Sequence, residues 1–412
     1  MSGQIKGFPE GFLWGSATSS HQVEGDNSNN DWSQWEQQGR VPFPSGQATR
    51  HYELFESDFQ LASVFHHNAH RFSIEWSRIE PQEGFFSNEA LAHYTKVIQS
   101  LRKKNIEPIV TLHHFTHPVW FAKKGGWLNK ESVSWFVRYT DKIVQTLGKE
   151  VKYWITINEP TVLAYHGYFM GIWPPGETSA IKTFHVIQRL IQAHRTSYTK
   201  IHKVYSKEKW TRPMVSFAHN LTVFKVCPLQ GNLMIRVGVD LRHRLYNLYF
   251  LHKTRCFLDF IGINYYAREY VSYERGSPLG ILGEKCNTRH GHVGHLNQLG
   301  WDHYPIGLWE VLSWLIKFKK PILITENGTC EKQDEFRWQF IKDHLKELKK
   351  ALEKSIPVIG YLYWSLLDNF EWHHGFAPRF GLIEVDYTTF KRTPRKSAYR
   401  FAEICKTNCL IE

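Results

Sequence analysis

The sequence lacks any apolar run approaching the roughly 18 residues that a membrane span requires. Its first residues, MSGQIKGFPEGF, contain no apolar core of signal-peptide length. The six cysteines, at positions 227, 256, 286, 330, 405 and 409, show no CxxC spacing and no dense framework. In a chain of 412 residues this scatter is typical of reduced thiols. These absences predict a cytoplasmic protein without a membrane partner.

The sequence also lacks a long basic arm, although it is basic overall. Lys and Arg number 51 against 39 Asp and Glu, which gives a net charge of +12. The positive residues are spread along the chain in short clusters, such as 102–104 and 317–320, and no nucleic-acid-binding motif is present. We therefore assign the excess to solvated helix faces and predict no nucleic-acid partner. The sequence does not explain why the charge is so high.

Aromatic residues, in contrast, are abundant. They make up 15% of the chain and include 16 Trp. Such residues build bulky cores, and they also stack on sugar rings or bases. Both interpretations stay open until the Trp positions are known.

Strand-like and helix-like segments alternate along the whole chain. Apolar strand patterns cover 13–18, 69–76, 107–115, 151–157, 214–218, 257–265, 321–325 and 358–366. Helical patterns cover 88–104, 133–147, 181–204, 233–251, 308–318, 335–353 and 395–405. Eight strands with helical crossovers favour an α/β fold, a (β/α)8 barrel. No Pro-, Gly- or Ser-rich linker divides the chain, so we predict a single domain over 1–412.

Two glutamates end apolar strands of this predicted barrel. Glu159 lies in TINEP at the end of the fourth strand, and Glu326 lies in ITENG at the end of the seventh. Reactive side chains of such barrels sit where strands end and βα loops begin. Two facing carboxylates are the minimal equipment for glycoside hydrolysis, but sequence gives no distance between them, so retention and inversion both stay open at this point.

Seven motifs, in order from about residue 8 to residue 399, resemble those of glycoside hydrolase family 1, the β-glucosidase and β-galactosidase family. They are FLWGSATSSHQVEG, RFSIEWSRI, TLHHFTHP, TINEP, DFIGINYY, ITENG and YWSLLDNFEWHHGFAPRFGL. The resemblance implies a retaining exo-β-glycosidase that cleaves small β-glucosides or β-galactosides from the non-reducing end. It implies Glu326 as nucleophile and Glu159 as acid/base.

The same resemblance implies a set of sugar-binding residues and no cofactor. The residues expected to bind the sugar hydroxyls are Gln22, His114, Asn158, Glu371 and Trp372. Trp364 is expected to form the stacking floor, Arg71 and Tyr266 to flank the nucleophile, and Trp301 to bound the leaving-group side. Amide, imidazole and carboxylate groups suit hydroxyls that both donate and accept.

The two glutamates need opposite electrostatic environments. Arg71 is expected to favour the charged form of Glu326, and the charge of Glu326 is expected to raise the pKa of Glu159. Adjacent histidines at 66–67, 113–114 and 373–374 invite a metal interpretation. Neighbouring residues on a strand point to opposite faces, so we predict no metal site.

Two departures from the family pattern stand out. Phe115 follows His114 where many relatives carry Trp. The chain is also short before the sixth strand, where only residues 251–257 follow Tyr249 and Phe250. The missing segment belongs either to the pocket mouth or to the opposite face and outer helix ring.

The main alternative is a catalytically inactive barrel that binds sugars or protein partners. The presence of both glutamates argues against it. Glu371 argues against 6-phosphosugar specificity, because its charge would repel a phosphate, and Glu159 argues against a thioglucosidase. The sequence decides neither the sugar, among glucose, galactose and fucose, nor the aglycone, nor the oligomeric state.

Overall fold

A closed barrel of eight strands forms the centre of the computed structural model, which describes residues 7–228, 233–272, 280–286 and 294–410. The strands follow the order β1-β11-β10-β7-β5-β4-β3-β2, and the paired strands are parallel. They are β1 (Leu13–Ala17), β2 (Ala69–Ser73), β3 (Glu107–Thr111), β4 (Tyr153–Asn158), β5 (Met214–Asn220), β7 (Ile261–Asn264), β10 (Ile322–Asn327) and β11 (Val358–Trp364). The predicted (β/α)8 barrel is confirmed.

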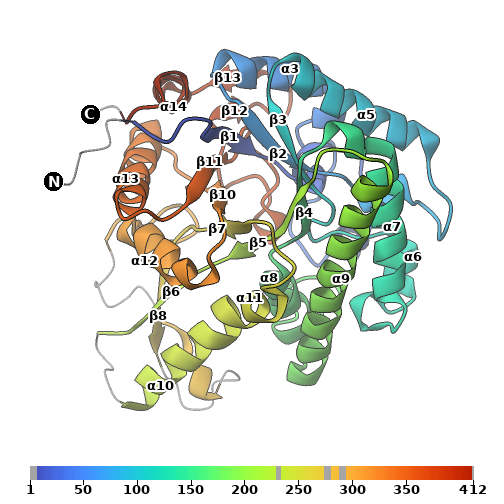
Figure 1. Cartoon of the computed structure of the whole chain (residues 1–412). Coiled ribbons are helices and arrows are strands. Elements are labelled where there is room, and N and C mark those ends of the chain that lie inside the picture. Colours follow the sequence, from blue (N-terminus) through green and yellow to red (C-terminus); the bar gives the residue numbers. More distant parts are fainter. Residues whose placement is uncertain (1–6, 229–232, 273–279, 287–293, 411–412) are drawn as a thin grey trace.

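Helices surround the barrel (Figure 1). They are α1 (Ser20–Val23), α2 (Asp31–Gln37), α3 (His51–Val64), α4 (Trp76–Ile79), α5 (Asn88–Lys103), α6 (Val119–Lys123), α7 (Ser132–Leu147), α8 (Pro160–Ala164), α9 (Ala180–Lys207), α10 (Leu233–Arg242), α11 (Tyr249–Thr254), α12 (Ile306–Leu315), α13 (Asp334–Glu353) and α14 (Lys396–Thr407). Short strands form two small sheets: β6 (Val223–Val226) with β8 (Arg268–Ser272) and β9 (Glu284–Lys285), and β12 (Ile383–Val385) with β13 (Arg392–Pro394). No helix in the described ranges is both long and apolar enough to cross a bilayer.

Helix α5 illustrates how the sequence fixes an element. The side chain of Ser87 caps it by accepting a hydrogen bond from the Ala90 N–H, at 3.1 Å. Leu91 and Ile98 then recur at helical spacing and are buried. Asn105, just past the end, takes a left-handed backbone with φ of 58°. The predicted helix over 88–104 is therefore confirmed.

Helix α3, in contrast, was not predicted. Its buried residues are His51, Asp58, Phe59 and Ala62, half of them polar, which weakens the apolar pattern in the sequence. Asp58 is nevertheless satisfied, because it pairs with His51 and Arg392, each at 2.8 Å. The predicted helix over 233–251 also differs, because a π-helical turn, η4 (His243–Leu248), separates α10 from α11.

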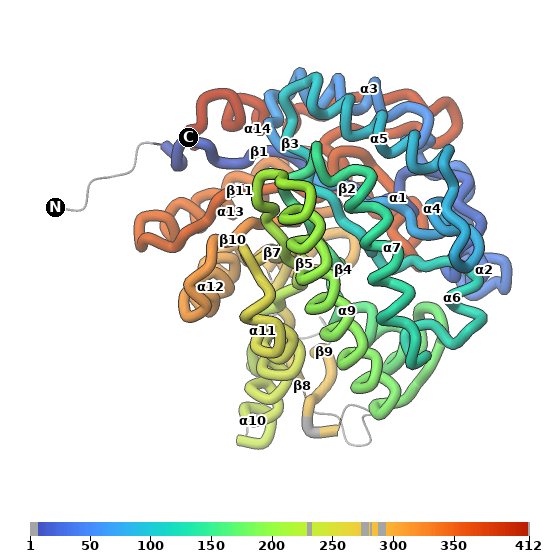
Figure 2. The backbone as a smooth tube through the Cα atoms, turned by 45° about the vertical axis from the view of Figure 1, so that its right-hand side comes forward, coloured from blue at the N-terminus to red at the C-terminus, as the bar shows by residue number. Residues whose placement is uncertain are grey.

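The two ends of the chain close the barrel together. Strand β1 pairs with β11, and the Phe8 N–H donates to the Asn408 carbonyl at 2.9 Å. Helix α14 lies beside the start of β1 in both backbone views, where Phe401 packs edge-on against Trp14 (Figures 1 and 2).

The barrel interior is apolar in its centre and polar at the carboxyl ends of the strands. Residues that fill it include Ala69, Ile109, Ile155, Ala218, Leu323 and Leu362. Because side chains alternate along a strand, Arg71 follows Ala69 on the inward face, one layer nearer the carboxyl ends. The carboxyl ends of the strands therefore carry the polar layer.

The short stretch before the sixth barrel strand lies on the opposite side of the barrel from that layer. Residues 255–260 join the end of α11 to the start of β7, and the Asp259 N–H bonds the carbonyl of Val215 near the start of β5 at 2.9 Å. This connection enters the amino end of β7. The short connection therefore lies away from the pocket mouth, and the place of the segment that longer relatives carry stays a prediction.

Candidate active site

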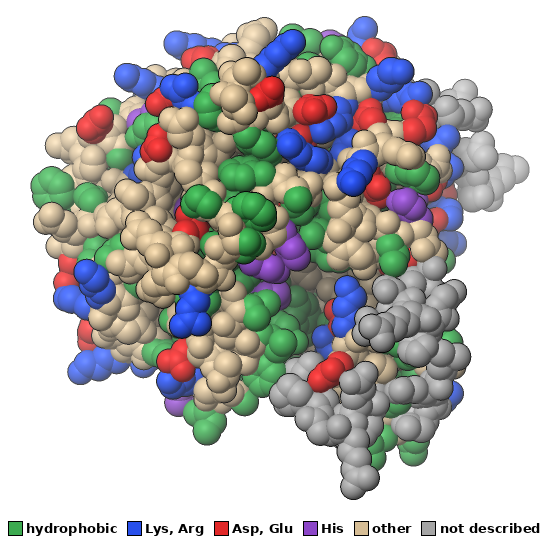
Figure 3. Space-filling view, turned by 180° about the vertical axis from the view of Figure 1, so that it is seen from behind, with side chains coloured by type: hydrophobic (Ala, Val, Ile, Leu, Met, Phe, Trp, Pro, Cys, Tyr) green, Lys and Arg blue, Asp and Glu red, His purple; other side chains and the backbone are tan. Residues whose placement is uncertain are grey.

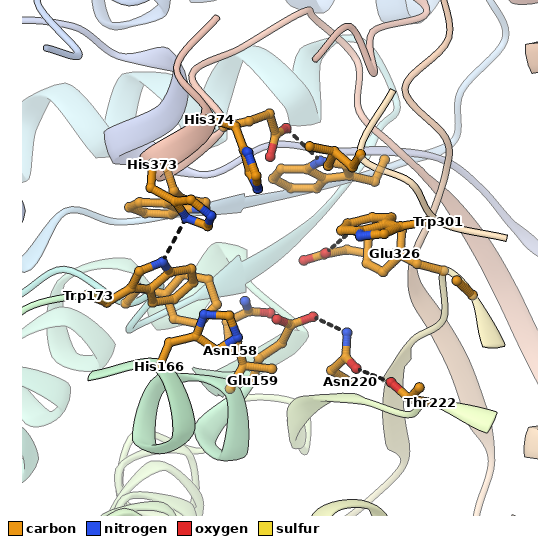
Figure 4. Close-up of a pocket in the computed structure, with 18 of the residues that line it drawn as sticks. Asn158, Glu159, His166, Trp173, Asn220, Thr222, Trp301, Glu326, His373 and His374 are labelled. Atoms are coloured by element: carbon orange, nitrogen blue, oxygen red, sulfur yellow. Dashed lines mark hydrogen bonds between the residues drawn. The ribbon is translucent and has the colours of Figure 1, made fainter. Parts of the chain in front are cut away.

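A cavity of about 360 Å³ opens at the carboxyl ends of the barrel strands. Predicted site residues in its lining are Gln22, His114, Asn158, Glu159, Tyr266, Trp301, Glu326, Trp364, Glu371 and Trp372. Arg71 is fully buried and contacts the pocket residues Glu326 and Asn158. The structure thus brings all eleven predicted residues together, and Figure 4 shows Asn158, Glu159, Trp301 and Glu326 of this set around the pocket.

Register irregularities place both glutamates at this cavity. Between Ile155 and Asn158, strand β4 has one residue more than β5 has between Ser216 and Ala218. Between Ile324 and Asn327, strand β10 likewise exceeds β11 by one residue. Such bulges interrupt the alternation of side chains and re-aim a residue. These bulges explain how each strand directs a glutamate side chain into the cavity although the residues before it are mostly apolar.

The backbone of Glu159 is also unusual. Its φ of 42° and ψ of 58° lie in the left-handed region, which residues with a Cβ rarely adopt. The Glu159 N–H is held by the Ala218 carbonyl at 2.8 Å, and Pro160 starts helix α8 directly after it. Phe115 and Trp372, also in the pocket lining, have positive φ values as well. Strained residues of this kind cluster at functional sites.

Glu326 is held on both oxygens. Arg71 forms an ion pair with Oε1, and the Tyr266 hydroxyl donates to Oε2 at 2.5 Å. Burial raises the pKa of Glu326 above its ordinary value, while Arg71 and Tyr266 lower it. The sequence argument considered the arginine and the tyrosine but not burial, and burial is the larger influence on this pKa.

Glu159 has a more strongly perturbed carboxyl. Burial and then the charge of Glu326 raise the pKa of Glu159 to about 8. Hydrogen bonds from Asn264 and Asn220 act in the opposite direction. The expected direction is found, with burial as the first cause. Glu159 is therefore protonated at neutral pH and can donate a proton.

Asn158 connects the two glutamates and His114. Its Oδ1 accepts from Arg71 at 2.6 Å and from Asn264 at 3.2 Å, which fixes the orientation of the amide. Its Nδ2 therefore donates to Nε2 of His114 at 3.2 Å. Burial and nearby Arg71 hold the pKa of His114 well below its usual range. His114 is thus neutral and carries its proton on Nδ1.

Gln22 is fixed by neighbouring groups. Its Nε2 donates to the Asn369 side chain and to the Phe370 carbonyl, both at 2.9 Å, and its Oε1 accepts from Ser19 at 2.6 Å. Both amide hydrogens are therefore engaged, and the amide oxygen has the capacity left for a ligand hydroxyl.

Glu371 and Trp364 form another part of the pocket wall. The Trp364 indole donates to Oε1 of Glu371 at 3.2 Å, and its ring lies parallel to that of His114, with centroids 6.0 Å apart. Burial raises the pKa of Glu371 to about 8. Hydroxyl groups that donate to this carboxyl would favour its charged form.

Trp301 and Phe115 bound the pocket as aromatic walls. Trp301 packs against Tyr266, with ring centroids 5.2 Å apart. Phe115 packs against Trp372 at 5.3 Å and against Trp173 at 4.9 Å. Trp173 therefore lies beside the position where many relatives were expected to carry Trp.

Several pocket residues were missed in the sequence. Asn220, Thr222, Tyr246, His166, Trp173, His373 and His374 line the cavity, and Asn264 contacts Glu159. Three of them had a signal: Asn264 lies within DFIGINYY, and His373 and His374 lie within YWSLLDNFEWHHGFAPRFGL. The others lie outside the quoted motifs, on the end of β5, on loops and on short helical turns.

The pair His373 and His374 corrects one expectation. The two rings do not point to opposite faces; their centroids are 3.9 Å apart, because they lie in a 3-10 turn rather than a strand. His373 accepts from the Trp173 indole at 3.1 Å (Figure 4). A hollow with clustered histidine side chains is visible on the face away from the view of Figure 1 (Figure 3). Within the described ranges, no group of three His, Cys, Asp or Glu side chains could hold a metal ion.

We expect Tyr266→Phe to move the acidic limb of the kcat/KM profile to higher pH. The tyrosine hydroxyl lowers the pKa of Glu326, so its removal raises that pKa, and the nucleophile role that the sequence resemblance implies for Glu326 requires the charged form. Loss of a hydrogen bond to a charged group predicts a fall in kcat/KM of about tenfold. Tyr265→Phe is the matched control, because the Tyr265 hydroxyl donates to the Tyr304 carbonyl instead. An unmoved acidic limb in Tyr266→Phe would contradict the assignment.

A (β/α)8 barrel with two glutamates in one pocket has the paired carboxyl groups that a glycoside hydrolase requires. Comparison with known proteins identifies the family. The sequence model of "Glycosyl hydrolase family 1" matches residues 4–234 and 238–410. The chain therefore belongs to glycosyl hydrolase family 1, and the predicted O-glycosyl hydrolase class is confirmed.

Named relatives agree with this family. A 1,4-β-D-glucan glucohydrolase of Thermotoga neapolitana is 30% identical over 99% of this chain and 100% of its own. A β-galactosidase of Pyrococcus woesei is 31% identical over 97% of each chain. The solved structure of a β-glycosidase from Pyrococcus horikoshii is 39% identical, with a TM-score of 0.91 over 99% of this chain and 96% of the other.

Proposed function

We propose that Glu326 is the nucleophile and Glu159 the acid/base of this retaining exo-β-glycosidase. The observation that carries the assignment is the contrast between the two carboxyls. Glu326 is paired with a buried arginine, whereas Glu159 has a pKa of about 8 and accepts hydrogen bonds from the uncharged amides of Asn264 and Asn220. A nucleophile must be charged and an acid must arrive protonated.

In the first step, an oxygen of Glu326 forms a bond to the anomeric carbon. The bond from that carbon to the leaving oxygen breaks, and its electron pair takes the proton of Glu159. In the second step, a water oxygen attacks the anomeric carbon while Glu159 takes the water proton, and Glu326 leaves as a carboxylate. Two inversions give net retention.

The sugar in the cleaved subsite is held by the other predicted residues. Glu371, Gln22 and Asn158 supply carboxyl and amide groups for its hydroxyls, and Trp364 supplies an aromatic face. Arg71 is a positioning residue for Glu326 and Asn158. Trp301 bounds the leaving-group side beside Tyr266. The partner is thus a small β-glycoside or oligosaccharide.

We also infer that residues 1–412 form one catalytic domain that acts in the cytoplasm. The pairing of β1 with β11 supports the first inference, because strands from both ends of the chain complete one barrel. The free thiols of Cys330 and Cys405 support the second, because cytosolic proteins keep their cysteines reduced. Fractionation of the source cells tests the location.

We predict strict selectivity for the sugar and loose selectivity for the aglycone. The residues that bind the sugar surround it with polar groups, whereas the outer side is bounded by the Trp301 ring. A panel of aryl β-glycosides, varied first in sugar and then in aglycone size, measures both preferences as kcat/KM. A steep fall with bulky aglycones would contradict an open outer side. Absence of turnover across the panel would contradict the proposed function itself.

A further inference from the structure

We propose that Asn220 and Thr222 are positioning residues for the acid/base. In this arrangement Thr222 orients the Asn220 amide, and the amide determines which oxygen of Glu159 carries the transferable proton. The inference rests on the acid/base role proposed above for Glu159. Asn220 ends strand β5, and Thr222 follows it at the pocket wall (Figure 4).

Two amides donate to the same oxygen of Glu159. Asn264 Nδ2 lies 2.7 Å from Oε1, and Asn220 Nδ2 lies 3.2 Å from it. An un-ionised carboxyl group has one carbonyl oxygen, which only accepts, and one hydroxyl oxygen, which donates. With two N–H groups directed at Oε1, that atom is the carbonyl oxygen. The proton then resides on Oε2.

The two amides are oriented by different neighbours. Asn264 faces two acceptors, because its Nδ2 also donates to Oδ1 of Asn158 at 3.2 Å. Asn220 depends on Thr222, whose hydroxyl donates to its Oδ1 at 3.1 Å. Since an amide can present either N–H or C=O to a neighbour, this hydroxyl favours the orientation that directs N–H to Glu159.

Thr222 is itself clamped by Asn247. The Thr222 N–H donates to Oδ1 of Asn247 at 3.1 Å, and Nδ2 of Asn247 donates back to the Thr222 carbonyl at 2.8 Å. Asn247 is fully buried in the π-helical turn η4. Unusual π-helical turns are frequent at functional sites. The chain of contacts therefore runs from a buried turn to the acid/base carboxyl.

This arrangement serves both steps of the reaction. In the first step Oε2 gives its proton to the leaving oxygen as the glycosidic bond breaks, and the resulting carboxylate keeps two N–H donors on Oε1. In the second step Oε2 takes a proton from the attacking water, while the new bond to the anomeric carbon displaces Glu326. Donors that strengthen as charge develops lower the barrier to proton release.

The test compares Asn220→Ala, Thr222→Val and the control Thr222→Ser in the full-length enzyme. Valine has the shape of threonine without its hydroxyl, whereas serine keeps the hydroxyl. We expect kcat/KM for a β-glycoside with a poor leaving group to fall about tenfold in Asn220→Ala and severalfold in Thr222→Val, with Thr222→Ser near wild type. An activated dinitrophenyl glycoside should be little affected, because its leaving group needs no proton.

Two further readouts separate positioning from a general structural effect. The basic limb of the kcat/KM profile should move to higher pH in Asn220→Ala, since its N–H lowers the pKa of Glu159. The double variant Asn220→Ala/Thr222→Val should lose no more than Asn220→Ala alone, because Thr222 acts through Asn220. Additive losses, or equal losses for both leaving groups with an unmoved limb, would overturn the proposal.

Glu159→Ala, assayed in parallel, distinguishes this inference from the proposed function. If Glu159→Ala shows the leaving-group dependence and the Asn220 and Thr222 variants do not, only the positioning role is wrong. If Glu159→Ala itself lacks the dependence, the acid/base assignment fails, and the positioning role fails with it.

Discussion

Replacing Glu326 with alanine is expected to lower kcat/KM for an activated aryl β-glucoside by at least about 10⁴-fold, because the covalent intermediate cannot form without its nucleophile. Arg71 and Tyr266 would then face an empty space in place of their carboxylate. Added azide should restore turnover with such a substrate, because a small anion can occupy that space. The product should be the α-glycosyl azide, since the attack comes from the side opposite the leaving group.

Glu331→Ala is the matched control for this prediction. Glu331 is also buried and follows strand β10, but its carboxyl bonds His295 at 2.9 Å and it does not line the pocket. The kcat/KM of Glu331→Ala should stay within about twofold of wild type, because Glu331 lies outside the reacting groups. Comparable losses in Glu326→Ala and Glu331→Ala, without rescue by azide, would contradict the nucleophile assignment.

Replacing Glu159 with alanine is expected to lower kcat/KM by an amount that depends on the leaving group of the substrate. Poor leaving groups should lose about 100- to 10,000-fold in kcat/KM, because they need the proton that Glu159 supplies. Activated aryl glycosides should retain their first step. Azide should accelerate the second step and yield the β-glycosyl azide, because an anion attacks the intermediate without a base.

The pH profile adds a second expectation for the same variant. The pKa of Glu159 is raised to about 8, so the protonated acid is lost as pH rises through that value. Wild-type kcat/KM for poor leaving groups should therefore fall above about pH 8, and Glu159→Ala should lose this dependence. The pKa of Glu371 is also raised to about 8, so Glu371 contributes to the pH profiles of both enzymes. The measurement is therefore the difference between the wild-type and Glu159→Ala profiles. Equal losses for both substrate types in the first step would contradict the acid role.

The strands and the paired glutamates could be predicted because their signals are local. Apolar runs end at TINEP and ITENG, and the barrel places such ends on one rim. Helix α3 could not be predicted in the same way, because its buried face contains Asp58 and His51, whose stabilising partner Arg392 lies more than 300 residues away in sequence.

The site residues that lie in recognisable motifs could be predicted. The residues that only the three-dimensional geometry brings to the site could not. The contact between Asn220 and Glu159 depends on a register irregularity in β4 and on the left-handed backbone of Glu159, which no residue pattern reveals. The rings of His373 and His374 lie together because of a 3-10 turn, against the strand rule applied to them. Burial, the first cause of the pKa shifts of Glu159 and Glu326, likewise appears only in three dimensions.

The stereochemistry of the first product tests the central claim most directly. If Glu326 forms a covalent glycosyl intermediate and Glu159 activates water in the second step, a β-glycoside must release the β-anomer first. Proton NMR of the reaction, recorded before mutarotation, should show the β-anomeric signal growing first and the α signal only later. An initial α-anomer would contradict the two-step mechanism and the roles given to both glutamates.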